Sequence, residues 1–205
     1  MRMVMTTKRP PIGHLLLEAF FVVLAVGLAW AANEWRTHRV EQRQAQDTLG
    51  ILTEELSSNR DAVLRSYTYH LELSDSLYSL IRRDTPASQM TFRGGFISRE
   101  MPLHAAWDAA QASGRLSYVA DHVGQDVLLG YANVYQRQHI YSEQKNLIGH
   151  LIYERLMDRG MQSLVQNYRN HTTIVGSMVY LEFELLNLYN TILQDSTAVP
   201  PPFRR

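Results

Sequence analysis

The feature that most constrains the fold is an apolar run near the N-terminus. Residues 15–32 read LLLEAFFVVLAVGLAWAA, and Glu18 is the one ionisable side chain among them. As a helix these residues rise about 27 Å, close to the roughly 30 Å hydrocarbon core of a bilayer. Trp30 and Trp35 stand at the far end, where aromatic residues mark the membrane interface. The pattern predicts a transmembrane helix over residues 12–35, with both tryptophans as interfacial anchors.

A secretory signal peptide is the alternative interpretation of this run. Arg2, Lys8 and Arg9 form a basic region ahead of it, and residues 29–31, Ala-Trp-Ala, have the small-x-small form of a cleavage site. A glutamate at position 18 is unfavourable within the apolar part of a signal peptide. We therefore expect the segment to be retained as a span.

The basic residues that flank the run do not by themselves decide its orientation. Three precede it in the tail, residues 1–11, and three follow it closely, namely Arg36, Arg39 and Arg43. The tail has no acidic residue, and long C-terminal domains cross the membrane largely regardless of their charge. We expect a single-pass protein of the bacterial inner membrane with a cytoplasmic N-terminus and a periplasmic C-terminal domain.

One face of the expected span collects an acidic residue and several small ones, at 100° per residue. Its members are Glu18, Val22, Ala25, Ala29, Ala32, Asn33 and Arg36. Small residues four apart allow a second helix to approach closely, and an intramembrane carboxylate is costly unless it is paired. We expect this face to dock on a partner helix. The alternative is that alanines are simply common in spans and that Glu18 extends to the lipid head groups.

Beyond the apolar run the sequence predicts an all-α domain over residues 36–194. Leucine, valine and tyrosine recur at three-, four- and seven-residue intervals as far as Arg83, with no proline before Pro86, so one helix is expected from about residue 11 to 83. A loop follows at about 84–102, where prolines and glycines cluster.

Three further helical stretches are expected after this loop. The first is short and ends at Gly114, the second covers about 115–160, and the third covers about 161–194. Glutamates and asparagines interrupt the apolar half of the third stretch, so it is not a second span. Together with the first helix they predict an antiparallel bundle standing on the membrane, followed by a proline-rich tail at 195–205.

Composition sets several classes of function aside. Lysine and arginine together number 20, and so do aspartate and glutamate. Without an excess of positive charge or a basic stripe interleaved with aromatics, we expect no binding of nucleic acid. The chain has no cysteine, which excludes disulfides, zinc thiolates and thiol nucleophiles.

Two histidine pairs come nearest to a metal motif. His139 with Glu143, and His150 with Glu154, have the i,i+4 spacing of neighbours on one helix face. A di-iron bundle requires Glu-x-x-His on two helices, and zinc proteases require His-Glu-x-x-His; the sequence has neither. We expect exposed helix pairs here, with no metal, no cofactor and no catalytic residues.

The glycine-containing part of the loop is not a nucleotide-binding motif. Phe92, Gly94, Gly95 and Phe96 follow no predicted strand, and no Lys-Ser or Lys-Thr comes after them. The glycines are most simply a turn, although the two phenylalanines suit an arm that clasps a neighbouring subunit. The many tyrosines stand at helical spacings, which favours bundle core and rim over a ligand cage.

Short motifs in two regions carry a resemblance to a known group. An early glutamate in the span, an Asn-x-Trp junction, a Glu-Leu-x-x-Asn element and a Trp-x-x-Ala-x-x-x-Gly-x-Leu segment are formed by Glu18, Asn33, Trp35, Glu55, Leu56, Asn59, Trp107, Ala110, Gly114 and Leu116. Over about the first 65 residues and about 15 near the middle, the chain resembles an uncharacterised family of bacterial single-pass membrane proteins. The resemblance implies a span with a helical extracytoplasmic domain, and it implies no particular activity.

Three classes of function follow from these observations. The first is a non-catalytic accessory or scaffolding subunit of a larger membrane complex, with a respiratory or photosynthetic electron-transfer assembly as one class of host. Its partners would be the lipid bilayer and other membrane subunits. The second is a membrane-anchored periplasmic sensor that binds a ligand. The third is a metal- or cofactor-dependent enzyme, which the sequence favours least.

Overall fold

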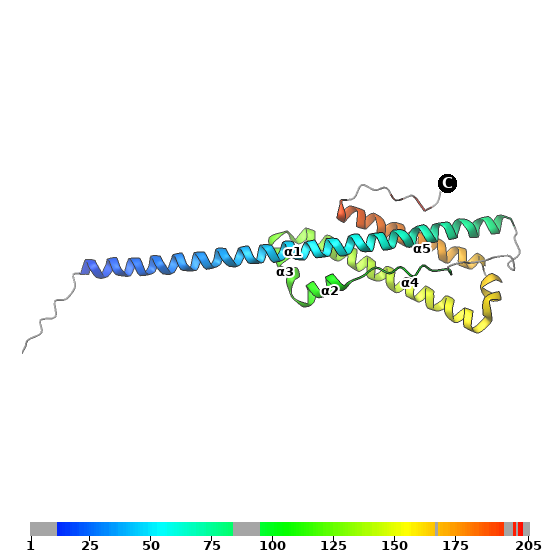
Figure 1. The fold of residues 1–205 in the computed structure, drawn as a ribbon, viewed down its shortest axis with the longest axis horizontal. Helices are drawn as coiled ribbons and strands as arrows, with labels where there is room; N and C mark the ends of the chain where they lie inside the picture. Colours follow the sequence, from blue (N-terminus) through cyan, green and yellow to red (C-terminus); the bar gives the residue numbers. More distant parts are fainter. Residues whose placement is uncertain (1–11, 84–94, 167, 195–198, 200, 203–205) are drawn as a thin grey trace, which may run out of the picture.

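The protein is all-α. The computed structural model describes residues 12–83, 95–166, 168–194, 199 and 201–202, with the side chains of residue 12 and of 155–171 left out. Its elements are α1 (Ile12–Arg82), α2 (Ala105–Ala112), α3 (Arg115–His122), α4 (Gln125–Gln166) and α5 (Tyr168–Leu193) (Figure 1). The fold class expected from the periodicity of the sequence is confirmed.

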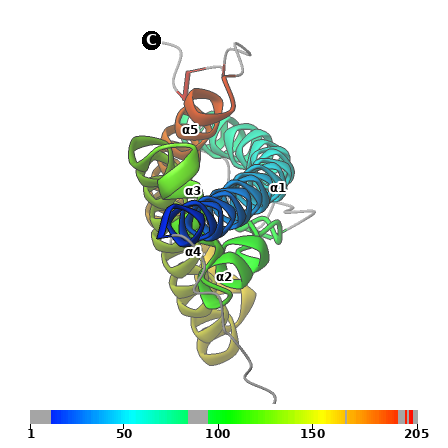
Figure 2. The same ribbon diagram turned by 90° about the vertical axis from the view of Figure 1, so that its left-hand side faces the viewer.

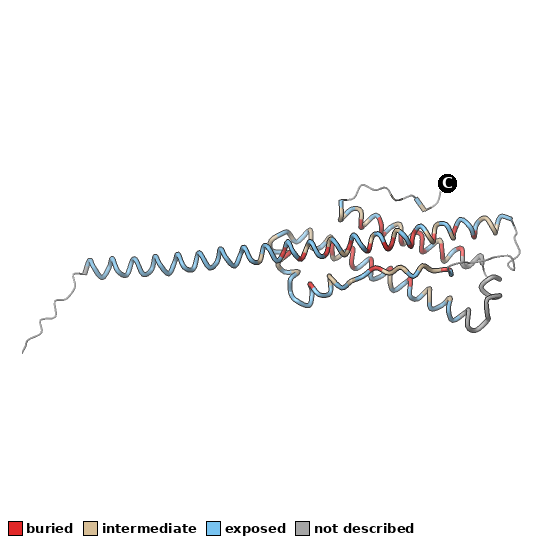
Figure 3. Tube along the Cα trace, in the orientation of Figure 1, coloured by how far each residue is buried: buried red, intermediate tan, exposed pale blue. Residues whose placement is uncertain are grey.

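The helix α1 has two halves with opposite surroundings. It runs for 71 residues without a break, about 107 Å. Its N-terminal part stands clear of the other helices and is exposed along its whole length, whereas buried residues begin at Ala45 (Figure 3). The exposed part includes a window with a mean hydropathy of 2.3, so α1 is long and apolar enough to cross a membrane. A signal sequence near an N-terminus has the same properties.

The chain returns along α1 before α4 begins. Gly95 contacts Tyr69, and Leu103 contacts Asn59, so the non-helical segment 95–104, which we call the strap, runs antiparallel to α1. At the end of this return path, His122 of α3 reaches Glu41.

The strap determines the directions of the long helices. In α4, Tyr131 lies against Thr53 and Lys145 against Ser66, so α4 runs parallel to α1. Helix α5 runs antiparallel to both and packs along each of them (Figures 1 and 2). The expected bundle is therefore present, but α1 and α4 run parallel. The reason is that the strap returns the chain along α1 before α4 begins.

The main core lies where α1, α4 and α5 meet. It is formed by Leu52, Leu56, Val63, Tyr67, Tyr131, Val134, Tyr135, Tyr141, Met178, Val179, Leu185, Leu186 and Tyr189. The residues from α1 are members of the periodic apolar set seen in the sequence. A smaller cluster of Leu77, Phe96 and Val175 continues the core towards the far end of α1. The prediction that most tyrosines belong to the bundle is confirmed at these positions.

Two glycines set the turns that fold α2 and α3 against α1. Gly114 has φ +71° between α2 and α3, and Gly124 has φ +138° between α3 and α4. Both values lie in the region that favours glycine. The stretch expected as one helix from about 115 to 160 is therefore divided at Gly124, and α4 continues past Gly160 to Gln166.

Candidate functional site

A network of polar side chains runs through the interior of the bundle. On α1, Asn59, Ser66 and His70 face the core and are 0–1% exposed. Glu182 of α5 is fully buried, and Lys145 of α4 is 2% exposed. Buried groups of this kind are stable only when each is hydrogen-bonded, so their partners determine what the network does.

The carboxylate of Glu182 is the centre of this network. Its Oε1 accepts hydrogen bonds from Ser66 Oγ at 2.6 Å and from Tyr141 OH at 2.7 Å. His70 Nδ1 lies 2.9 Å from Oε1 and 2.8 Å from Oε2. Three side chains from two other helices thus converge on one carboxylate.

The hydrogen bonds of His70 define its tautomer. The backbone N–H of Ser98, in the strap, donates to Nε2 at 2.9 Å, so this nitrogen carries no proton. The proton is therefore on Nδ1, which donates to Glu182. His70 acts as a neutral bridge between the strap and α5.

Lys145 supplies the positive charge of the network. Its Nζ donates to Ser66 Oγ and Tyr141 OH, each at 2.9 Å, and to the backbone carbonyl of Glu100 in the strap at 2.5 Å. All three ammonium protons are thereby used. Burial lowers the pKa of Lys145 to about 8, although the negative charges of Glu182 and Glu100 oppose that shift.

A second group of side chains fixes the strap two helical turns away, at Asn59 of α1 and Gln138 of α4. Asn59 donates from Nδ2 to the carbonyl of Leu103 and accepts at Oδ1 from its N–H, both at 2.7 Å. Gln138 Nε2 donates to the same carbonyl at 2.5 Å, and Tyr189 OH donates to Gln138 Oε1 at 2.6 Å. One strap residue is thus bound by both α1 and α4, with α5 in support.

Glu55 repeats this arrangement at the start of α2. Its Oε2 accepts from the backbone N–H of Ala106 at 2.8 Å, and Tyr135 OH donates to its Oε1 at 2.8 Å. A carboxylate is favourable at this position because the first N–H groups of a helix lack partners within it. The polar interior therefore holds the strap and the start of α2 against α1.

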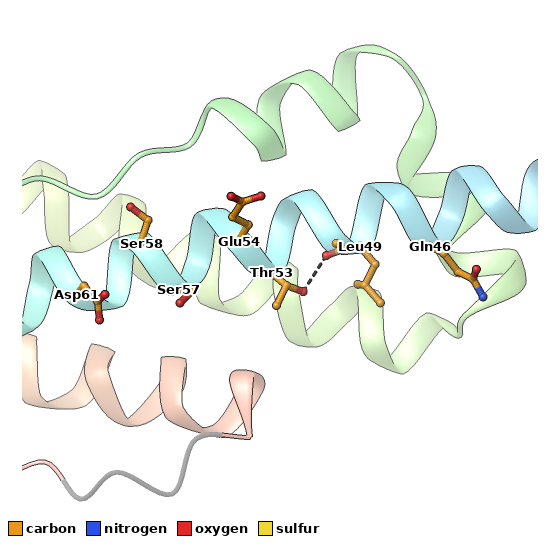
Figure 4. A pocket seen from close by; sticks show the side chains of 8 residues that line it. Gln46, Leu49, Thr53, Glu54, Ser57, Ser58 and Asp61 are labelled. Atoms are coloured by element: carbon orange, nitrogen blue, oxygen red, sulfur yellow. Dashed lines mark hydrogen bonds between the residues drawn. The ribbon is translucent and has the colours of Figure 1, made fainter.

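The chemistry of the site is that of a closed structural network. Ser66, His70 and Glu182 are 0% exposed and Tyr141 is 2% exposed. Their hydrogen-bonding groups face one another. An open hollow on the surface is lined by eight residues of α1 alone, including Thr53, Glu54 and Asp61 (Figure 4). Groups from opposing elements do not converge there as they do in an active site.

The residues predicted to dock in the membrane all lie on the free part of α1. Glu18, Val22, Ala25, Ala29, Ala32, Asn33 and Arg36 are exposed. Trp30 and Trp35 are exposed too, and the guanidinium of Arg39 lies 4.4 Å from the centre of the Trp35 ring. The docking face remains a prediction. Its residues are not covered by the other described helices, so a second helix could reach them.

The predicted clasp loop is only partly described. Phe92 and Gly94 lie outside the described residues. Gly95 has φ +86°, as expected of a turn, and its carbonyl accepts from Tyr69 OH at 2.6 Å. Phe96 packs in the small core cluster of its own chain, and so its ring anchors the strap. A clasp on a neighbouring subunit remains a prediction.

The two histidine pairs of α4 are surface pairs. His139 and Glu143 approach to 3.2 Å, His150 and Glu154 approach to 3.1 Å, and all four side chains are more than half exposed. Each pair lies on one helix face, as their spacing predicts, and faces water.

The buried network was not foreseen, although the sequence holds a signal for it. Asn59, Ser66 and His70 occupy the same alternating three- and four-residue seam as Leu56 and Val63. Polar residues at such seam positions indicate an interior hydrogen-bond network. Their partners on α4 and α5 could not be paired without knowing that α4 runs parallel to α1.

The comparisons with known proteins give no relative. No family model, curated protein or solved structure matches the chain.

Removal of the Asn59 side chain tests whether the strap is held as described. Asn59→Ala eliminates two hydrogen bonds to Leu103 and one to Gln138, and it leaves the N–H of Leu103 without its partner, so we expect a loss of about 2 kcal/mol in unfolding free energy. Amide hydrogen exchange at Leu103 should accelerate. Ser58→Ala, at the exposed neighbouring position, is the control. Equal exchange rates at Leu103 in both variants would contradict the assignment.

Proposed function

We propose that the chain is a non-catalytic accessory or scaffolding subunit of a larger bacterial membrane complex. The first part of α1 would anchor it in the inner membrane, with the N-terminus in the cytoplasm and the bundle in the periplasm. The observation that carries the proposal is the unbroken course of α1 from a bare apolar segment into the bundle core. Such a helix fixes the bundle at a set distance and direction from the membrane, which is what a bracing subunit requires.

The uncovered docking face supports a protein partner within the membrane. From Leu15 to Trp30 the large apolar side chains are 45–71% exposed. Within the described residues Glu18 has no hydrogen-bond or ion-pair partner, and a carboxylate at this depth is usually paired. A neighbouring helix that supplies a donor at the level of Glu18 would satisfy it. A respiratory or photosynthetic electron-transfer assembly is the class of host in which we would look first.

The closed interior supports a structural role. Lys145, His70 and Glu182 would be the natural reactive groups, but their hydrogen-bonding capacity is used within the fold.

Bulky residues on the docking face test the proposal. In Ala25→Leu/Ala29→Leu the added side chains would keep a partner helix from close approach, so we expect the chain to leave its complex. The measurement is native electrophoresis of gently solubilised membranes, in which the wild-type chain should migrate well above its own 23.6 kDa. The double variant should shift to the position of the free chain.

The control is Phe20→Leu/Val23→Leu, which changes apolar residues on the other side of the same helix. This variant should stay in the complex. Migration of the wild-type chain as a free subunit would sink the proposal, and so would equal release of both variants.

A further inference from the structure

Two histidines and a glutamate meet where α1 enters the bundle. His38 and Glu41 are three residues apart on α1 and therefore share one helix face. His122 is the last residue of α3, and it approaches these two α1 residues from that neighbouring helix. The Nε2 atom of His122 lies 3.3 Å from Oε2 of Glu41, and the rings of His38 and His122 are 4.7 Å apart.

The positions of these three side chains are fixed by packing. Ala45 of α1 and Val119 of α3 are fully buried where the two helices meet. The glycine turns at Gly114 and Gly124 set the two ends of α3. His122 is consequently delivered to the same place in every folded molecule, and its side chain is only 9% exposed.

The donor set matches a transition-metal ion. One ligand atom from each residue lies within 4.8 Å of the other two. Tetrahedral zinc with bonds of about 2.0–2.1 Å places its ligands about 3.3 Å apart, which is the distance already present between Glu41 and His122. His38 is exposed, so rotation of its side chain can supply the remaining approach.

We propose that His38, Glu41 and His122 form a binding site for a divalent transition-metal ion, with Zn²⁺ as the ion tested first. Two imidazole nitrogens and one carboxylate oxygen are ligands of intermediate softness, which favours Zn²⁺ over Mg²⁺ or Ca²⁺. Three protein ligands leave a fourth position for water or for a group from another molecule. The ion joins α3 to α1 and so closes the bundle at the end nearest the apolar segment.

Metal titration of the full-length chain tests this site. The protein is prepared in detergent without a polyhistidine tag, treated with a chelator, and titrated with ZnCl₂ by calorimetry. We expect one saturable site per chain and a higher thermal midpoint with zinc. Co²⁺ in place of Zn²⁺ should give the visible absorption of a tetrahedral complex.

Matched variants separate this site from the other histidines. His38→Ala, Glu41→Gln and His122→Ala should each weaken zinc binding by about tenfold or more. His139→Ala and His150→Ala, which alter the exposed pairs of α4, should leave it unchanged. His38 is exposed and its replacement leaves the core intact, so loss of binding in that variant does not reflect unfolding.

Three results would overturn the proposal. The first is the absence of saturable zinc binding by the wild-type chain. The second is zinc binding that survives both His38→Ala and His122→Ala. The third is loss of binding in the α4 variants to the same extent, which would indicate adsorption to surface histidines.

Discussion

Glu182→Gln should lower the free energy of unfolding by about 3–5 kcal/mol, the scale expected when one charge is removed from a buried charged network. The amide keeps the shape of the side chain but brings an NH₂ group among the donors Ser66, Tyr141 and His70. It also removes one of the two negative charges, those of Glu182 and Glu100, that act on the buried ammonium of Lys145. Urea unfolding of the detergent-solubilised chain measures the change, with Trp107, stacked on Tyr135 in the bundle, as a fluorescent reporter.

The matched control is Glu184→Gln, an identical change two residues away on the exposed side of α5. Its effect should stay within about 0.5 kcal/mol. Adding Lys145→Met to Glu182→Gln should cost less than the sum of the single changes, because the double variant buries no uncompensated charge. Equal midpoints for the two glutamate variants would show that the network does not stabilise the fold.

Unfolding at alkaline pH is the second large effect expected. Burial, the largest cause, raises the pKa of Tyr135, Tyr141 and Tyr189 above the ordinary 10.0, and nearby glutamates raise it further. Above pH 10 the unfolded chain releases these protons while the folded chain keeps them. Stability conferred by the three phenols is therefore complete below pH 10 and falls above it, by up to about 1.4 kcal/mol per pH unit for each.

At lower pH, Lys145 changes the stability in the opposite direction, so that stability increases as the pH rises. Its pKa is about 8 in the folded chain and 10.5 ordinarily, so the unfolded chain binds the extra proton between these values. Stability should consequently rise from pH 8 towards 10 and then fall steeply. Urea midpoints across this range measure the profile. Tyr135→Phe should reduce the descending slope by about a third, and a slope unchanged by that substitution would exclude the buried phenols as its cause.

The sequence predicted the elements of this fold better than their arrangement. Helical periodicity and the lack of proline located α1 to within a residue or two of its bounds, and Gly114 was correctly expected to end a short helix. The turn at Gly124 was missed because the residues on both sides have good helical periodicity. The parallel course of α1 and α4 was missed because the strap has no periodicity from which its path could be inferred.

The interior network and the proposed metal site were beyond prediction for the same physical reason. Glu182 lies in an apolar stretch, where it was interpreted only as evidence against a second span. The structural role of Glu182 depends on His70 and Lys145, each of which is more than thirty residues away in the sequence. His38 and Glu41 likewise become a possible site only when α3 delivers His122. Spacing along one helix cannot identify ligands that come from two.

The unbroken α1 also has a mechanical consequence. Between Ala32, at the end of the apolar run, and Arg82, at the end of the helix, lie fifty residues, about 75 Å of continuous helix. If the first part tilts by about 10° in the bilayer, the far end moves sideways by about 13 Å. In the proposed membrane-anchored arrangement, a small change in the angle of the first part of α1 would thereby be amplified into a displacement as wide as a helix at the far end of the bundle.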